Sequence, residues 1–190
     1  YSFASHASNL LALANTWAVL VRQVLAETLE ALDALHSAQR VHGALRPESI
    51  FIVSNASGRF EPRIGGLFCQ RFDDRSAGEY VTGAEVYRAP ERLNAAAVPQ
   101  TAEDIWSFGL LSVRALTGRL PFPSGGGLGG ISRPRELSHH APDLSRVVPE
   151  LRDVLKAWLE LDPANRPTAA EVLSHFSGSM PTESGISRPE

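Results

Sequence analysis

The sequence predicts a mainly α-helical domain, α+β overall, in which one small β-hairpin accompanies the helices. Apolar residues recur at three- and four-residue steps in several segments, which is typical of helices with one buried face. Two short runs rich in β-branched and aromatic residues lie close together, as the strands of a hairpin do. At 190 residues the chain is long enough for one well-packed domain and short for two.

The first predicted helix covers residues 17–36. Its buried stripe is formed by residues spaced three or four apart: Trp17, Leu20, Val21, Val24, Thr28, Leu32 and Leu35. The stretch "GALRP" stops this helix, because Gly43 and Pro47 both oppose its continuation.

The predicted hairpin follows directly. Its first strand is "SIFIV" at residues 49–53, its turn is "NASG" at 55–58, and its second strand is "RIGGLF" at 63–68. Residues 69–86 are mixed and polar, and we expect them to form a surface loop.

The remainder of the chain is predicted to be mostly helical. One helix starts at Thr101 as its N-cap and stops at Gly118. Two more helices fall within 148–163 and 166–176, with Pro149 and Pro167 at or near their first turns. A glycine-rich segment at 123–134 is expected to be flexible, and the Ser/Gly/Pro-rich tail at 177–190 is expected to be disordered.

Composition excludes several classes of protein. The net charge of −3 leaves no basic surface for nucleic acid, and no apolar run is long enough to span a membrane. Cys69 is the only cysteine, so the chain has no internal disulfide and no cysteine-rich metal site. A single cysteine favours an intracellular location and leaves a secreted protein open.

Five segments in a fixed order resemble the C-terminal lobe of a eukaryotic-type protein kinase. They are "LHSAQRVHGALRPESI", "RIGGLF", "YRAPERL", "DIWSFGLLSVRALTGRLPF" and "LDPANRPTAAEVLSH", and they extend from Trp17 to Phe176. The resemblance implies a kinase-like lobe at residues 1–176 that carries the glycine-rich insert, and an N-terminal lobe that is not in the chain.

The resemblance also shows where this sequence departs from the family pattern. At the position of the catalytic Asp stands Ala44, at that of the Lys stands Arg46, and at that of the metal-binding Asn stands Ser49. Gly66 occupies the position of the second metal-binding residue, an Asp. These degenerate positions imply no catalytic, metal-binding or cofactor-binding residues, no cofactor, and no ready binding of ATP.

A second group of residues matches the family pattern and is expected to be structural. His42 corresponds to the buried histidine of the catalytic loop, and Asp104 to the carboxylate that accepts hydrogen bonds from that loop's backbone. Glu91 and Arg166 correspond to a buried ion pair.

Loss of a positioned general base costs about two to four orders of magnitude in rate, and loss of the metal ligands costs more. We therefore expect a pseudokinase that is not an enzyme. It would bind another protein or a complex as a scaffold, an allosteric regulator or a structural subunit. The alternative is a kinase-fold enzyme with altered nucleotide-dependent transfer chemistry, which a magnesium-dependent response to nucleotide would reveal.

Overall fold

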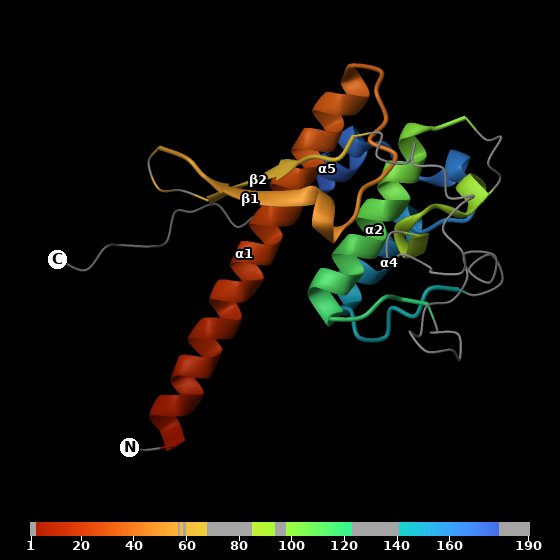
Figure 1. Cartoon of the computed structure of the whole chain (residues 1–190). Coiled ribbons are helices and arrows are strands. Elements are labelled where there is room, and N and C mark those ends of the chain that lie inside the picture. The colour runs from red at the N-terminus through yellow and green to blue at the C-terminus, as the bar shows by residue number, and fades with distance from the viewer. Residues whose placement is uncertain are drawn as a thin grey trace, which may run out of the picture.

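A computed structural model describes residues 3–56, 58, 60–67, 85–93, 98–122 and 141–178. Its longest element is α1, Phe3–Ser37, and the N-terminal part of this helix extends away from the rest of the molecule (Figure 1). Around the C-terminal part of α1 gather a two-stranded sheet and the helices α2, α4 and α5 (Figure 1). The predicted class, a mainly helical lobe with one small hairpin, is confirmed.

Helix α1 begins earlier than predicted. The sequence indicated a start at Trp17, but the helix continues back to Phe3, since residues 3–16 contain neither proline nor glycine to interrupt it. Of the predicted buried stripe, Thr28 and Leu32 are buried, whereas Leu20 is exposed. Leu25 and Leu29, which were not predicted, are also buried. The helix ends at Ser37, one residue beyond the predicted end at His36, and Gln39 then adopts a left-handed backbone conformation with φ of 56°.

The hairpin is confirmed with shifted strands. Strand β1 is Ile50–Ser54 and strand β2 is Phe60–Ile64, paired antiparallel with Ile50 opposite Ile64. The second strand therefore ends before the glycine pair of "RIGGLF", because Gly66 has a φ of 76°, which no strand residue adopts. The strands lie across α1 (Figure 1), and β2 packs against it.

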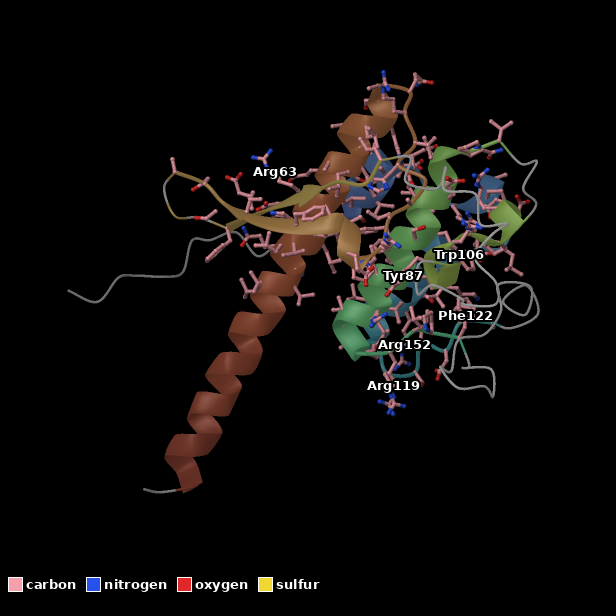
Figure 2. All side chains as sticks on the ribbon, in the orientation of Figure 1. Arg63, Tyr87, Trp106, Arg119, Phe122 and Arg152 are labelled. Carbon is pink, nitrogen blue, oxygen red and sulfur yellow. The ribbon has the colours of Figure 1, made fainter. Side chains whose placement is uncertain are left out.

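Helix α2, Thr101–Thr117, is the centre of the core. Every residue from Glu103 to Val113 is buried, so this helix is covered on all sides and packs against both α1 and α4. Its Trp106 side chain is fully buried and stacks on Phe122 with the ring centroids 5.8 Å apart (Figure 2).

The two ends of α2 differ from each other in how well the sequence predicted them. Gly118 ends the helix as expected, with φ of 75° and its N–H donated to the carbonyl of Arg114. The predicted N-cap, Thr101, is wrong, because Thr101 is the first helical residue and Gln100 is the N-cap without a side-chain hydrogen bond.

Helix α4, Pro149–Trp158, and helix α5, Ala169–Gly178, complete the described fold. Pro149 occupies the first turn of α4 as predicted, whereas Pro167 precedes the first residue of α5. Since α5 continues to Gly178, the predicted tail loses its first two residues to this helix. The rest of the tail, the insert at 123–134 and most of the loop predicted at 69–86 lie outside the described residues.

Short 3-10 helices at Pro47–Ser49, Glu85–Tyr87, Pro90–Leu93 and Pro163–Asn165 connect the larger elements. Within the part of the chain that is described, no helix combines the length and the apolar character needed to cross a bilayer.

Candidate functional site

The loop of residues 41–49 is fixed to α2 by the carboxylate of Asp104. Asp104 Oδ2 accepts a hydrogen bond from the backbone N–H of His42, and Oδ1 accepts one from the backbone N–H of Gly43, each at 2.8 Å. Both carboxylate oxygens are therefore used to hold loop backbone, and Asp104 is almost fully buried. The conformation of the loop consequently depends on a residue that is 62 positions away from His42 in the sequence.

Two histidines lie beside this carboxylate. His36, in the last turn of α1, places its Nε2 atom 2.8 Å from Asp104 Oδ2. His42 is fully buried, and its Nδ1 accepts the N–H of Ala44 while its Nε2 lies 3.0 Å from the carbonyl oxygen of Gly65. An accepting Nδ1 leaves the proton of a neutral ring on Nε2, where it is donated to Gly65. Burial lowers the pKa of His42, and the nearby Asp104 opposes that shift.

The reactive positions of the loop carry neither a carboxylate nor an amide. Ala44 has no functional group, and Ser49 is buried and engaged within the loop itself. The Ser49 hydroxyl accepts the N–H of Arg46 at 2.9 Å and donates to the carbonyl of Arg46 at 2.7 Å. Ser49 therefore closes a turn around Arg46 and Pro47, and its oxygen is not available to a ligand.

The charged side chains of the loop point towards solvent. The side chain of Glu48 is 71% exposed, and one of its oxygens lies 4.0 Å from Nε of Arg46. Gly66 follows β2 with a left-handed backbone. Asp73 and Asp74, the acids that follow "RIGGLF" in the sequence and could have replaced the missing carboxylate, lie outside the described residues. No group of three His, Cys, Asp or Glu side chains that could hold a metal ion occurs among the residues described.

Glu91 and Arg166 form a two-point ion pair between the segment at residues 90–93 and the connection that precedes α5. Arg166 Nη1 donates to Glu91 Oε1 at 2.6 Å, and Nη2 donates to Oε2 at 2.8 Å. The Arg166 side chain also donates to the carbonyls of Glu160 and Ala102, and its guanidinium carbon lies 5.0 Å from the centroid of the Trp106 ring.

A second buried ion pair was not predicted. Arg92 Nε lies 2.9 Å from Glu103 Oε2, and the two side chains are 16% and 4% exposed. A Cβ atom placed on Gly43 would lie only 3.1 Å from Glu103 Oε1, so this carboxylate borders the loop directly. Burial raises the pKa of Glu103 to about 7, and the attraction of Arg92 opposes the rise.

A third unpredicted contact joins Tyr87 and Arg114. The Arg114 Nη1 atom donates to the Tyr87 hydroxyl at 2.7 Å. Tyr87 is buried, whereas Arg114 on α2 is exposed. Burial raises the pKa of Tyr87, Arg114 opposes that rise, and the charge of Glu48 adds to it. The Tyr87 hydroxyl therefore lies within electrostatic reach of the loop.

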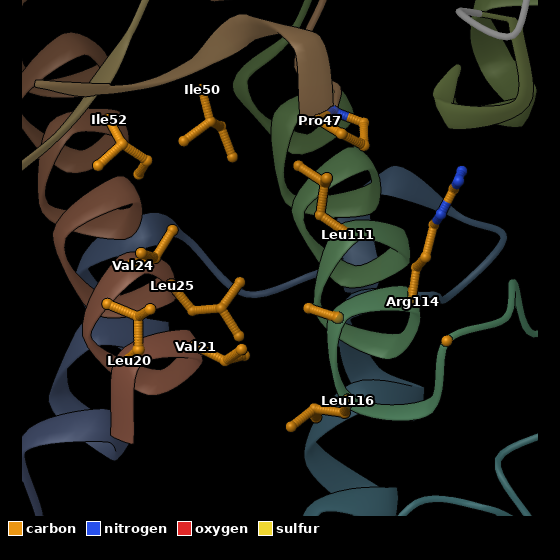
Figure 3. Close-up of a pocket in the computed structure, with 12 residues that line it drawn as sticks. Leu20, Val21, Val24, Leu25, Pro47, Ile50, Ile52, Leu111, Arg114 and Leu116 are labelled. Carbon is orange, nitrogen blue, oxygen red and sulfur yellow. The ribbon is translucent and has the colours of Figure 1, made fainter. Parts of the chain in front are cut away.

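An apolar groove of about 730 Å³ lies between α1, β1 and α2 (Figure 3). Ile50 and Ile52 of β1 face it from one side, and Leu111 of α2 faces it from another. Pro47 and Arg114 also line it, and among the described residues of its lining Arg114 is the charged one.

The residues that the prediction missed had a weak sequence signal. Glu103 and Asp104 are adjacent acids in the first turn of a helix, a position where exposed acids are common. However, the residues that follow them are apolar on every face of the helix, which predicts burial of the acids as well. That pattern was the available sign of a buried carboxylate beside Asp104.

Comparison with known proteins identifies the relatives of this chain. A family model described as the protein kinase domain matches residues 11–176. The serine/threonine-protein kinase pkn2 of Myxococcus xanthus is 33% identical over 162 residues, covering 80% of this chain and 19% of that protein. The serine/threonine-protein kinase PAK mbt of Drosophila melanogaster is 30% identical over 159 residues, covering 82% of this chain and 24% of that protein. The chain thus spans about a fifth to a quarter of the length of these relatives.

These relatives correct one expectation. The interpretation of the chain as a protein that is not an enzyme is wrong, because the proteins it resembles are named as serine/threonine-protein kinases, which are enzymes. Ala44, Ser49 and Gly66 are differences in side-chain chemistry within an enzyme family. The expectation that ATP binding is unlikely has no support among the relatives and stays a prediction.

Proposed function

The chain belongs to the protein kinase domain family, and on that premise we propose that it takes part in a nucleotide-dependent transfer reaction with altered chemistry. The observation that carries the proposal is the loop of residues 41–49. Its backbone is held by Asp104 through two hydrogen bonds, while Ala44 and Ser49 stand at positions where the family pattern has an Asp and an Asn.

The retained loop geometry supports positioning of an acceptor. Fixed backbone and buried supports such as His42 keep a loop in one conformation, and positioning alone contributes several kcal/mol to many enzymatic reactions. Arg46 keeps a cation at the position where the family pattern has a lysine, so the loop retains a group that can stabilise negative charge on a transferred group.

The altered part of the chemistry concerns proton transfer and metal ligation. Ala44 cannot accept a proton from the acceptor, and the only carboxylate in the loop is the exposed Glu48. Ser49 and Gly66 supply neither the amide nor the carboxylate that the family pattern has at these positions, so we assign no step to a metal ion held by them. We expect a slow reaction, since a positioned general base contributes about 10²- to 10⁴-fold.

The test is to incubate the full-length protein with ATP, with and without magnesium, and to identify any group transferred by mass spectrometry of the protein and of added acceptor proteins. Covalent addition of a phosphoryl or a nucleotidyl group would support the proposal and identify the reaction. The Arg46→Gln variant is expected to lose that transfer, and Arg63→Gln, which removes an exposed arginine of β2, is the matched control. Absence of transfer, together with no thermal shift at millimolar ATP, would overturn the proposal.

A second variant separates this chemistry from that of the relatives. Ala44→Asp places a carboxylate at the loop position where the family pattern has one. If the loop already positions an acceptor, the added base is expected to raise the transfer rate by at least about tenfold. An unchanged rate would show that the loop does not face an acceptor.

Binding of another protein is the second candidate function, and the exposed hairpin favours it. Phe51, Ile52 and Phe60 are large apolar side chains that are each more than half exposed. Ile52 and Phe60 share one face of the sheet and Phe51 lies on the other, because side chains alternate along a strand. Exposed apolar side chains of this kind favour a surface that a partner covers, as a scaffold or an allosteric regulator requires. Loss of partner capture by the Phe51→Ser and Phe60→Ser variants, with unchanged unfolding, would support this role. Unchanged capture of a partner by both variants would exclude the hairpin as the binding surface.

A further inference from the structure

Arg114 gives the molecule a cation that is fixed in place and exposed. Its guanidinium group is anchored by the 2.7 Å hydrogen bond to the hydroxyl of Tyr87, a side chain that is only 2% exposed. A buried, rigid partner restrains the long arginine side chain, so less conformational entropy is lost when it binds a further group.

Within the described part of the chain, Arg114 has no ion-pair partner. The Tyr87 hydroxyl is a neutral partner, because burial raises the pKa of this tyrosine above an already high value. Glu48 is the acid whose charge reaches the same hydroxyl, and its carboxylate already lies 4.0 Å from Arg46.

Arg114 also lies on the loop side of α2. Pro47, which follows Arg46 in the loop, and Arg114 line the same groove. In Figure 3 the Arg114 side chain extends from α2 towards the level of Pro47, and its guanidinium group points away from the apolar side chains of α1. Among the described residues, the loop contributes the guanidinium group of Arg46 and the carboxylate of Glu48, which lie 4.0 Å apart, and α2 contributes the guanidinium group of Arg114.

We propose that Arg114, with Arg46, makes this surface a binding site for an acidic peptide segment of a partner or substrate protein. A carboxylate on either side of the acceptor residue can pair with Arg114, which presents several N–H donors in one plane. A lysine or an arginine at the same place meets an uncompensated positive charge and is disfavoured. That the bound segment contains the acceptor of the transfer reaction rests on the proposed function. Binding of the segment to the protein can be measured without any transfer reaction.

The experiment uses the full-length protein and two short fluorescein-labelled peptides that differ only in the residues beside a central serine. One peptide carries glutamates there and the other carries lysines, and their affinities are compared by fluorescence anisotropy without nucleotide. We expect the acidic peptide to bind about fivefold more tightly or better, and its affinity to fall as salt is added.

Variants at position 114 make the test specific. Arg114→Glu is expected to weaken binding of the acidic peptide about fivefold or more and to strengthen binding of the basic peptide. A gain for the basic peptide cannot arise from misfolding. Tyr87→Phe removes the anchoring hydroxyl and is expected to produce a smaller loss. Arg119→Glu, at an exposed position just beyond the C-terminal end of α2 (Figure 2), is the charge-matched control and should leave the preference unchanged.

Equal affinity for the two peptides would overturn the inference, and so would equal effects of Arg114→Glu and Arg119→Glu. The result is distinguishable from failure of the proposed function. If the acidic peptide binds through Arg114 but receives no group from ATP, the result supports the binding surface and contradicts the proposed transfer reaction.

Discussion

Arg92 and Glu103 form a buried ion pair whose carboxylate also borders the backbone of Gly43. The pair connects three segments: the 3-10 helix Pro90–Leu93, the first turn of α2, and the loop of residues 41–49. Glu103 therefore pairs with the 3-10 helix through Arg92 and lies directly beside the loop at Gly43. Because its pKa is raised to about 7, it also changes charge close to neutral pH.

The charge of Glu103 is expected to make stability depend on pH. A raised carboxyl pKa means that the folded protein binds this proton more tightly than the unfolded chain does. The resulting stabilisation is complete below the ordinary glutamate pKa of 4.5 and is lost as the pH rises through the folded-state pKa of about 7. The shift corresponds to about 3 kcal/mol at most. Urea unfolding from pH 5 to 8 should show that Glu103→Gln gains stability relative to the wild type as the pH rises.

The comparison with Glu103→Gln is needed because His42 titrates in the opposite sense. Burial lowers the pKa of His42, so its contribution is present above 6.5 and is lost as the pH falls. The difference between wild type and variant isolates Glu103. A difference in unfolding free energy that stays constant from pH 5 to 8 would contradict the raised pKa.

Gly43 is expected to tolerate alanine less well than Gly118 does. Both glycines have positive φ, 69° and 75°, so alanine is strained by about 1 kcal/mol at either position. At Gly43 the new methyl group also meets Glu103 Oε1 at 3.1 Å, whereas at Gly118 nothing lies within 4 Å. Gly43→Ala should thus lower the free energy of unfolding by about 1 kcal/mol more than Gly118→Ala. Equal losses would show that the carboxylate moves aside without cost.

Glu91→Gln is expected to destabilise the fold by about 3 kcal/mol. The variant removes the charge that pairs with Arg166, whose side chain is fully buried, and leaves that cation poorly compensated. Glu61→Gln is the control, because its partner Arg63 is 67% exposed and such pairs contribute less than about 1 kcal/mol. Denaturant unfolding at neutral pH measures both. Similar small losses of unfolding free energy in the two variants would show that the Glu91 pair contributes no more than an exposed ion pair does.

Asp104→Asn is expected to lower the free energy of unfolding by about 2 kcal/mol. An amide has one acceptor atom in place of two, so either the His42 or the Gly43 backbone N–H loses its partner in a buried place. Asp153→Asn, on the exposed side of α4, is the matched control and should change stability little. An unchanged midpoint in Asp104→Asn would mean that water replaces the carboxylate oxygen.

The fold could be predicted from the sequence where a local signal decides the structure. Gly118 ends α2 as expected, because a left-handed residue there needs no tertiary partner. The start of β2 at Phe60 could not be predicted, since pairing with β1 decides which residues join the strand. The start of α1 at Phe3 was missed because alanine is a weak apolar signal, although Phe3, Ala7, Leu10, Leu11 and Ala14 recur at three- and four-residue steps before Trp17.

The candidate site could be predicted only in part. Residue identities at positions 44, 49 and 66 follow from the printed sequence, and so does the adjacency of Asp104 to Glu103. The contact between Glu103 and Arg92 brings together a helix and a separate segment that only the tertiary structure places side by side. The hydrogen bond between Tyr87 and Arg114 likewise joins residues 27 positions apart, and an arginine on a helix otherwise predicts a solvated side chain.

The position of Asp104 has a consequence for how the molecule opens. The Asp104 carboxylate contacts His36 at the end of α1 and accepts hydrogen bonds from the backbone N–H groups of His42 and Gly43 in the loop. Asp104 itself belongs to the buried helix α2. The loop cannot leave its place without also freeing contacts of two core helices, so its local opening is joined to opening of the whole lobe. Amide hydrogens of His42 and Gly43 should accordingly exchange with solvent as slowly as those in the middle of α2, which sets this loop apart from ordinary surface connections.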